Sequence, residues 1–217
     1  MCGRFGFAKS KENVKKRFNL KKLPDELPLK YNIAPQQQIP VILNESPDEL
    51  SMIRWGLLPS WSKEEKTAYS MTNARAETIM EKPSYKKLIQ SKRCLILADS
   101  FYEWQKNDAG KVPHRIYMKN EDMFAFAGIW DCWEKEGKGI KTCSIITTSP
   151  NSLMKSIHDR MPVILKESDE AAWLSNIKID RVLALLTAYS DDQMAAYPIS
   201  TLVNSPTNNS PKTQCFS

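Results

Sequence analysis

Short apolar segments separated by polar turns fill the middle of the chain, and they constrain its fold more than any other feature. The segments are residues 39–43, 50–58, 93–106, 114–118, 123–133 and 142–148, and the turns NESPD, KNDAGK and EKEGKG each join two of them. Apolar runs of this length bounded by turn residues are typical of β-strands, and strands joined by short turns pair antiparallel. The pattern therefore predicts a mostly antiparallel β-sheet or barrel.

Helical segments flank these strands. Ser10 can cap a helix that runs to about Phe18, and Pro83 can open one that runs to about Gln90. A further amphipathic helix is expected over residues 179–188. Because the strands follow one another and the helices lie outside them, the predicted fold class is α+β, with a barrel-like core and peripheral helices.

The length fits one domain. The chain has 217 residues, of which 41% are hydrophobic and 26% charged, a composition that can bury a core. We expect a single domain over residues 2–203 and a weakly ordered polar tail over residues 204–217. There is no apolar run of about 18 residues and no apolar stretch like that of a secretory signal. With five widely spaced cysteines, these features predict a cytoplasmic protein.

Several kinds of site are disfavoured by the composition. Neither CxxC nor CxxH occurs and there are only two histidines, so no metal site and no cofactor is expected. The seven glycines form neither a GxGxxG nor a Walker motif, which argues against nucleotide hydrolysis. The net charge of +6 permits nucleic-acid binding through phosphates, although a lysine-rich surface explains the same charge.

The second residue is a cysteine. An initiator methionine is usually removed before a small side chain, which would give Cys2 a free α-amine beside its thiol. The amine has an intrinsic pKa of about 7.7–8.0 and the thiol of about 8.5, so both nucleophiles are partly available near neutral pH. Such an aminothiol condenses with an aldehyde to an imine, and the thiol then closes a thiazolidine ring. The alternative is a cysteine without a role in a frayed terminus.

Two carriers of acid–base chemistry stand out. Glu103 lies between two aromatic residues at the end of an apolar strand, where burial can raise the pKa of a carboxyl group. His158 is followed directly by Asp159, and histidine transfers protons near pH 7. The alternatives are that Glu103 faces water in the strand alternation and that His158 makes only a structural contact with Asp159.

The segment TNARAE is the third polar motif. The amide of Asn73 can orient an amine or a carbonyl group, and the guanidinium of Arg75 is suited to phosphate. The alternative is a polar loop in which Asn73 forms a turn and Arg75 pairs with Glu77.

Six short motifs occur along the chain in a fixed order. They are MCGRF at the start, YNIAP at 31–35, WGLLPSW at 55–61, NARAE at 73–77, FYEW at 101–104 and HDRMP at 158–162. In these motifs the chain resembles the SRAP (SOS response-associated peptidase) family, which includes abasic-site processing proteins. The resemblance extends from residue 2 to about residue 200.

The resemblance implies a sensor of abasic sites in single-stranded DNA. Such a protein forms a covalent thiazolidine crosslink through its N-terminal cysteine and shields the lesion in the DNA damage response. It implies that Cys2 is the nucleophile and that Asn73 positions its amine. Glu103 would be the acid or base that helps to open the deoxyribose ring, and His158 a second proton-transfer group.

The resemblance also implies a DNA-binding surface. The matching positions are Arg4, Arg75 and Arg160 for phosphates, Trp61, Trp104 and Pro35 for an apolar wall against bases, and Thr147 for a polar pocket. Some members carry a second tryptophan after the one that matches Trp61, and Ser62 stands there in this chain. Base stacking can contribute about 1–3 kcal/mol per base, so this departure puts part of the affinity in doubt.

Other functions remain open beside crosslinking. Lyase-type processing of the DNA is a linked activity. Cys2 could instead act as a cysteine-type peptidase, at least to remove Met1, with Glu103 or His158 as base. A third possibility is a module that binds single-stranded DNA without making a bond. The expected partner is single-stranded DNA with abasic sites, with no membrane or metal. We expect a monomer, associated with the nucleoid if the protein is bacterial.

Overall fold

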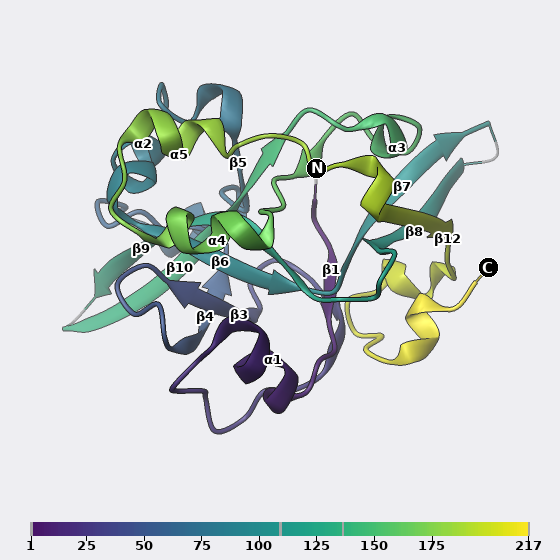
Figure 1. Cartoon of the computed structure of the whole chain (residues 1–217), viewed down its shortest axis with the longest axis horizontal. Helices are drawn as coiled ribbons and strands as arrows, with labels where there is room; N and C mark the ends of the chain where they lie inside the picture. The colour runs from purple at the N-terminus through teal and green to yellow at the C-terminus, as the bar shows by residue number, and fades with distance from the viewer. Residues whose placement is uncertain (1, 109, 136, 217) are drawn as a thin grey trace.

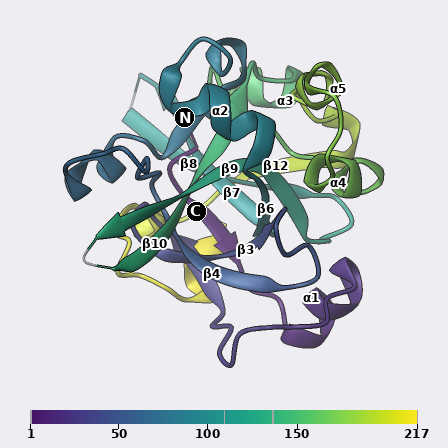
Figure 2. The same cartoon turned by 90° about the vertical axis from the view of Figure 1, so that its left-hand side faces the viewer.

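The larger of two sheets closes into a barrel. The computed structural model describes residues 2–108, 110–135 and 137–216. The order of this sheet is β11-β10-β4-β3-β6-β9, and β9 also pairs with β10, so that five strands form a ring. The strands are β3 (Gln38–Leu43), β4 (Leu50–Trp55), β5 (Asn73–Arg75), β6 (Arg93–Ala98), β9 (Phe124–Lys135), β10 (Lys138–Thr148) and β11 (Met161–Pro162). Figure 2 shows this barrel with helices outside it.

Most strand pairs are antiparallel, as the hairpin pattern predicts. The exceptions are the parallel pairs that β10 makes with β4 and with β5. The second pair places Asn73 beside Ile145 at one end of β10. The α+β fold class with a barrel-like core is therefore confirmed.

The smaller sheet lies beside the barrel, and its order is β12-β8-β7-β1-β2. Its strands are β1 (Phe5–Phe7), β2 (Lys30–Ile33), β7 (Ser100–Asn107), β8 (Gly110–Met118) and β12 (Met194–Pro198). In Figure 1, β1 descends from the N-terminus between the barrel and the strands β7, β8 and β12. Its Phe5 ring packs edge-on against Trp55 and Phe126 of the barrel, with ring centroids 5.3 and 5.7 Å away. These contacts fix the strand that follows Cys2.

Within the described residues, five α-helices lie outside the sheets (Figures 1 and 2). They are α1 (Lys11–Phe18), α2 (Pro83–Ser91), α3 (Ser152–Lys155), α4 (Glu167–Leu174) and α5 (Ile179–Ala184). The predicted starts of two of them are confirmed: Ser10 Oγ accepts a hydrogen bond from Asn13 N at 3.3 Å, and Pro83 opens α2. α5 ends at Ala184, earlier than predicted. No helix in the part of the chain that the structure describes has the length and apolar character needed to cross a membrane.

One expected strand proves to be two. The segment 93–106 divides at Asp99 into β6 of the barrel and β7 of the smaller sheet. The buried Asp99 carboxylate accepts hydrogen bonds from Ala8 N at 2.5 Å and from Ser100 Oγ at 2.8 Å. These bonds stabilise a buried polar corner, and the corner passes the chain from one sheet to the other. It sets the direction of β7, which carries Glu103.

The segment after residue 203, for which a weakly ordered tail is expected, makes hydrogen bonds to the body of the protein. Asn209 Oδ1 accepts a hydrogen bond from Tyr31 N at 2.7 Å, and Gln214 Nε2 donates to Tyr102 Oη at 2.8 Å. Residues 211–214 form a 3₁₀ turn. Tyr31 and Tyr102 lie more than a hundred positions from their partners in this segment, so its composition does not reveal these two contacts.

Candidate active site

Cys2 lies inside the protein, at the end of the chain that leads into β1. Its side chain is fully buried, and its carbonyl oxygen accepts a hydrogen bond from Asn73 Nδ2 at 3.0 Å. Asn73 Oδ1 is also buried and has no hydrogen-bond partner among the described residues. Burial raises the pKa of the Cys2 thiol, and the negative charge of Glu103 raises it further. The thiol is therefore protonated at neutral pH, and a free acceptor oxygen of Asn73 lies close to the Cys2 backbone.

Glu103 lies on β7 with only 3% of its surface exposed. The neighbouring Tyr102 N donates to Arg4 O at 2.9 Å, which joins β7 to the chain between Cys2 and β1. Burial raises the pKa of Glu103 to about 7, and the charge of Asp159 acts in the same direction. The strand alternation allowed Glu103 to face water, and this alternative is wrong. At neutral pH Glu103 exists in both protonation states, which suits a group that transfers protons.

His158 follows α3 and faces Glu103, with 3.7 Å between His158 Nε2 and Glu103 Oε2. Its Nδ1 lies 3.0 Å from the backbone N–H of Arg160 and 2.9 Å from Asp159 Oδ1. A backbone N–H can only donate, and Asp159 is exposed, so we assign Nδ1 as an acceptor and the proton to Nε2. Burial lowers the pKa of His158. The neutral imidazole therefore directs its N–H towards the Glu103 carboxylate.

The four predicted catalytic residues thus come together from four separate segments. Cys2 contacts Asn73, the charge of Glu103 acts on Cys2, and His158 faces Glu103. The arrangement brings together a thiol, an amide, a carboxyl group and an imidazole.

The cost of burying Glu103 can be measured as a function of pH. Its folded pKa of about 7 exceeds the unfolded value of about 4.3, so stability falls as the pH rises towards 7 and the folded state must bury a charge. We expect Glu103→Gln to raise the free energy of unfolding by up to about 4 kcal/mol at pH 8.5 and by little at pH 4. Urea titrations of both proteins at these pH values test this. An equal difference at both pH values would contradict it.

The three arginines predicted to contact phosphates differ in the hydrogen bonds that they already make within the protein. Arg160 donates two 2.8 Å hydrogen bonds to the Glu77 carboxylate and a third, also 2.8 Å, to Thr147 O. Arg4 donates to Asn32 Oδ1 at 2.9 Å and to a backbone carbonyl at 2.5 Å. Arg75 is exposed, and it makes neither a side-chain hydrogen bond nor an ion pair within the described residues. Glu77 therefore pairs with Arg160 and not with Arg75.

The predicted apolar wall consists of side chains with different exposure. Trp61 is 65% exposed, whereas Trp104 is half-buried and donates from Nε1 to Asn204 Oδ1 at 2.8 Å. Pro35 is partly buried, and Thr147 is fully buried against Arg160.

Ser62 points inward, in contrast to Trp61. Its Oγ lies 2.9 Å from Thr67 Oγ1, and its carbonyl oxygen accepts from Trp133 Nε1 at 2.7 Å. Ser62 therefore fastens the loop that presents Trp61, and it adds no ring to the exposed surface.

Two residues near the site have a supporting role that the sequence analysis missed. The buried Asn32 holds Arg4, and Tyr85 Oη donates to Asn73 O at 3.4 Å. Asn32 lies within the motif YNIAP, which is the signal that could have found it. No pattern points to Tyr85, because its contact requires α2 to fold against β5. No group of three potential metal ligands occurs among the residues described.

An N-terminal segment carries a buried cysteine to a glutamate–histidine pair, between a barrel and a second sheet. This arrangement defines a class of proteins with their candidate nucleophile at residue 2. The chain belongs to the SOS response-associated peptidase (SRAP) family, whose family model matches residues 1–206.

Similar proteins cover nearly the whole chain. Abasic site processing protein YoqW of Bacillus subtilis (strain 168) is 50% identical, over 98% of each chain. Abasic site processing protein HMCES of Xenopus tropicalis is 32% identical, over 98% of this chain and 77% of its own. A crystal structure of a protein from Bacteroides thetaiotaomicron superimposes with a TM-score of 0.90 at 32% identity, with both chains fully covered.

Proposed function

We propose that this protein processes abasic sites in single-stranded DNA and forms a covalent thiazolidine crosslink through Cys2 after Met1 has been removed. The observation that carries the proposal is the burial of Cys2 between Asn73 and the Glu103–His158 pair. The names of the relatives point to abasic sites as the lesion, in a DNA damage response. We expect the protein to act as a monomer, because its terminus has to receive the strand. We expect it to act in the cytoplasm.

The chemistry follows from the groups present. An abasic deoxyribose is a ring-closed aldehyde, and neutral Glu103 can donate a proton to the ring oxygen as the ring opens. The C1′ hydroxyl gives up its proton in the same step, which returns Glu103 to its neutral form. The Cys2 amine attacks C1′, and one of its N–H protons passes to the aldehyde oxygen. Water then leaves with a proton from neutral Glu103, and the remaining N–H proton returns to the Glu103 carboxylate as the imine forms. The thiol then adds to the imine carbon, and its proton passes to the nitrogen. His158 Nε2–H stabilises the Glu103 carboxylate after each donation.

The buried environment sets the order of these steps. Because burial keeps the thiol protonated, the amine is the nucleophile that reacts first. The Asn73 amide group holds the Cys2 carbonyl and leaves Oδ1 available to accept from the amine. Single-stranded DNA suits such a site, since an unpaired lesion can leave the strand and enter a pocket.

The test is a crosslinking assay. Wild-type protein mixed with a single-stranded oligonucleotide that contains one abasic site is expected to give a band that survives denaturation and migrates as a one-to-one adduct. An oligonucleotide with tetrahydrofuran at the lesion has the same shape but no latent aldehyde, and it should give none. Equal bands with both oligonucleotides, or no band with either, would overturn the proposal.

The same residues favour peptidase activity as a second candidate, limited to removal of Met1. Cys2 adjoins the bond to be cut, and Glu103 and His158 lie beside it. Intact mass measurement of Cys2→Ala decides the matter: retention of Met1 supports cleavage by the protein itself, and its loss assigns removal to a host aminopeptidase.

A further inference from the structure

The arrangement of cations around Asn73 points to a binding site that extends beyond the six sequence motifs. We infer that a pocket between β5 and the start of α2 binds a backbone phosphate of the DNA strand next to the lesion, with Lys82 as its second cation. The pocket has a volume of about 250 Å³, and its polar lining comes from Asn73, Arg75, Thr78, Lys82, Ser84 and Tyr85. This inference rests on the proposed function.

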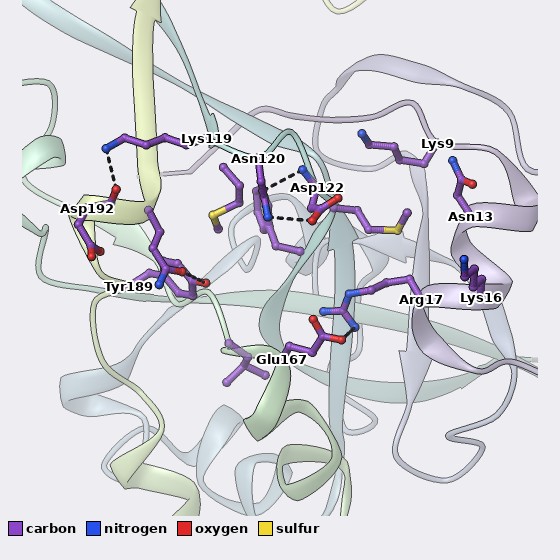
Figure 3. Close-up of a pocket in the computed structure, with 15 residues that line it drawn as sticks. Lys9, Asn13, Lys16, Arg17, Lys119, Asn120, Asp122, Glu167, Tyr189 and Asp192 are labelled. Carbon is purple, nitrogen blue, oxygen red and sulfur yellow. Dashed lines mark hydrogen bonds and ion pairs between the residues drawn. The ribbon is translucent and has the colours of Figure 1, made fainter.

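The charge of this pocket sets it apart from the other cavities described. Two cations and three hydroxyl groups line it, and no carboxylate does. The largest cavity, about 800 Å³, contains Asp122, Glu167 and Asp192 in its wall (Figure 3). Two further cavities each include two acidic residues. Among the cavities described, the pocket beside β5 is therefore the one whose wall offers an anion cations without a carboxylate.

The cations of the large cavity and those of the pocket beside β5 also differ in whether protein groups already bind them. In the large cavity Arg17 lies 3.5 Å from Glu167, and Lys119 Nζ donates to Asp192 O at 2.6 Å, as Figure 3 shows. Arg75 and Lys82 are both exposed, and neither has a hydrogen-bond or ion-pair partner for its side chain within the described residues. A bound phosphate would therefore displace no existing ion pair.

The pocket is continuous with the candidate active site. Asn73 belongs to both, since its side chain donates to Cys2 O and its carbonyl oxygen accepts from Tyr85 Oη at 3.4 Å. Because Asn73 contacts Cys2 and also lines the pocket with Arg75 and Lys82, we place the phosphate next to a sugar held at Cys2 in this pocket. Arginine offers a fork to phosphate oxygens and lysine a point charge, and serine can add a hydroxyl donor.

The experiment measures binding without crosslinking. Fluorescence anisotropy with a single-stranded oligonucleotide carrying tetrahydrofuran gives the Kd across a range of salt concentrations. We expect Lys82→Gln to weaken binding by roughly threefold to tenfold and to make the slope of log affinity against log salt shallower by about 0.7, the contribution of one phosphate contact on a single strand. Ser84→Ala should weaken binding without changing the slope, since it removes no charge.

Lys87→Gln is the matched control. Lys87 is exposed on α2, the helix that begins directly after Lys82, and its variant loses the same charge, but Lys87 does not line the pocket. Oligonucleotides with tetrahydrofuran at the 5′ or the 3′ end carry phosphates on one side only, and the effect of Lys82→Gln should persist on one of them and vanish on the other. Equal slopes for the two lysine variants, or equal effects on both oligonucleotides, would overturn the inference.

The proposed function is judged separately in the same set of experiments. If wild-type protein crosslinks abasic DNA while Lys82→Gln leaves the salt slope unchanged, only the phosphate site is wrong. If wild-type protein forms no crosslink, the proposed function fails, whatever the slopes are.

Discussion

Cys2→Ser protein is expected to give no denaturation-resistant adduct with abasic single-stranded DNA. Removal of Met1 still leaves an α-amine on the second residue of this variant, so an imine forms, but the weaker hydroxyl nucleophile does not hold it as a stable five-membered ring. Addition of cyanoborohydride should restore a band, because hydride reduces the imine C=N bond to a stable secondary amine. The readout is the band intensity on a denaturing gel with and without the reductant.

Cys215→Ser is the control for this experiment. Cys215 is a free, exposed thiol in the last part of the chain, and its removal should leave the adduct unchanged. If Cys2→Ser crosslinks like the wild type without reductant, or if Cys215→Ser loses the adduct, then the thiol of Cys2 does not close the ring.

Glu103→Gln is expected to slow crosslinking by about 10²–10⁴-fold, the usual contribution of general acid–base catalysis. With a pKa of about 7, Glu103 loses its proton as the pH rises, whereas the amine gains reactivity as it deprotonates near pH 7.7–8.0. The wild-type rate should therefore pass through a maximum close to neutral pH. In the variant the fall on the alkaline side should disappear, because an amide does not titrate.

Single-turnover crosslinking rates from about pH 5.5 to pH 9 measure both effects. Glu121→Gln is the matched control, since Glu121 lies in the turn after β8, where its carboxylate pairs with Arg115 away from Cys2. A pH profile of Glu103→Gln with the same shape as that of the wild type would contradict the assignment of Glu103 as the proton donor.

Much of the fold could be predicted from local patterns. Short apolar runs and turn residues located the hairpins, and Ser10 and Pro83 located two helix starts, because these signals act over a few residues. The division of residues 93–106 at Asp99 could not be predicted. It depends on the backbone N–H of Ala8, which lies 91 positions away and satisfies the buried carboxylate.

The candidate site shows the same limit. The motifs indicated which residues carry chemistry, but not which arginines are already engaged. Arg160 is held by Glu77, 83 positions earlier, and Arg75 is left exposed. The inward orientation of Ser62 likewise depends on Trp133, which reaches its carbonyl oxygen from β9.

The sequence by itself determined the reactive groups of this protein: an aminothiol once Met1 is removed, a carboxyl group, an imidazole and an excess of cations. Only the tertiary structure decided that Cys2 is buried against Asn73 and that Glu103 loses its contact with water. The physical reason is that a side chain's identity is local, whereas its desolvation and its partners are created by strands and loops distant along the chain. The reactivity of Cys2 depends on this desolvation and on these partners.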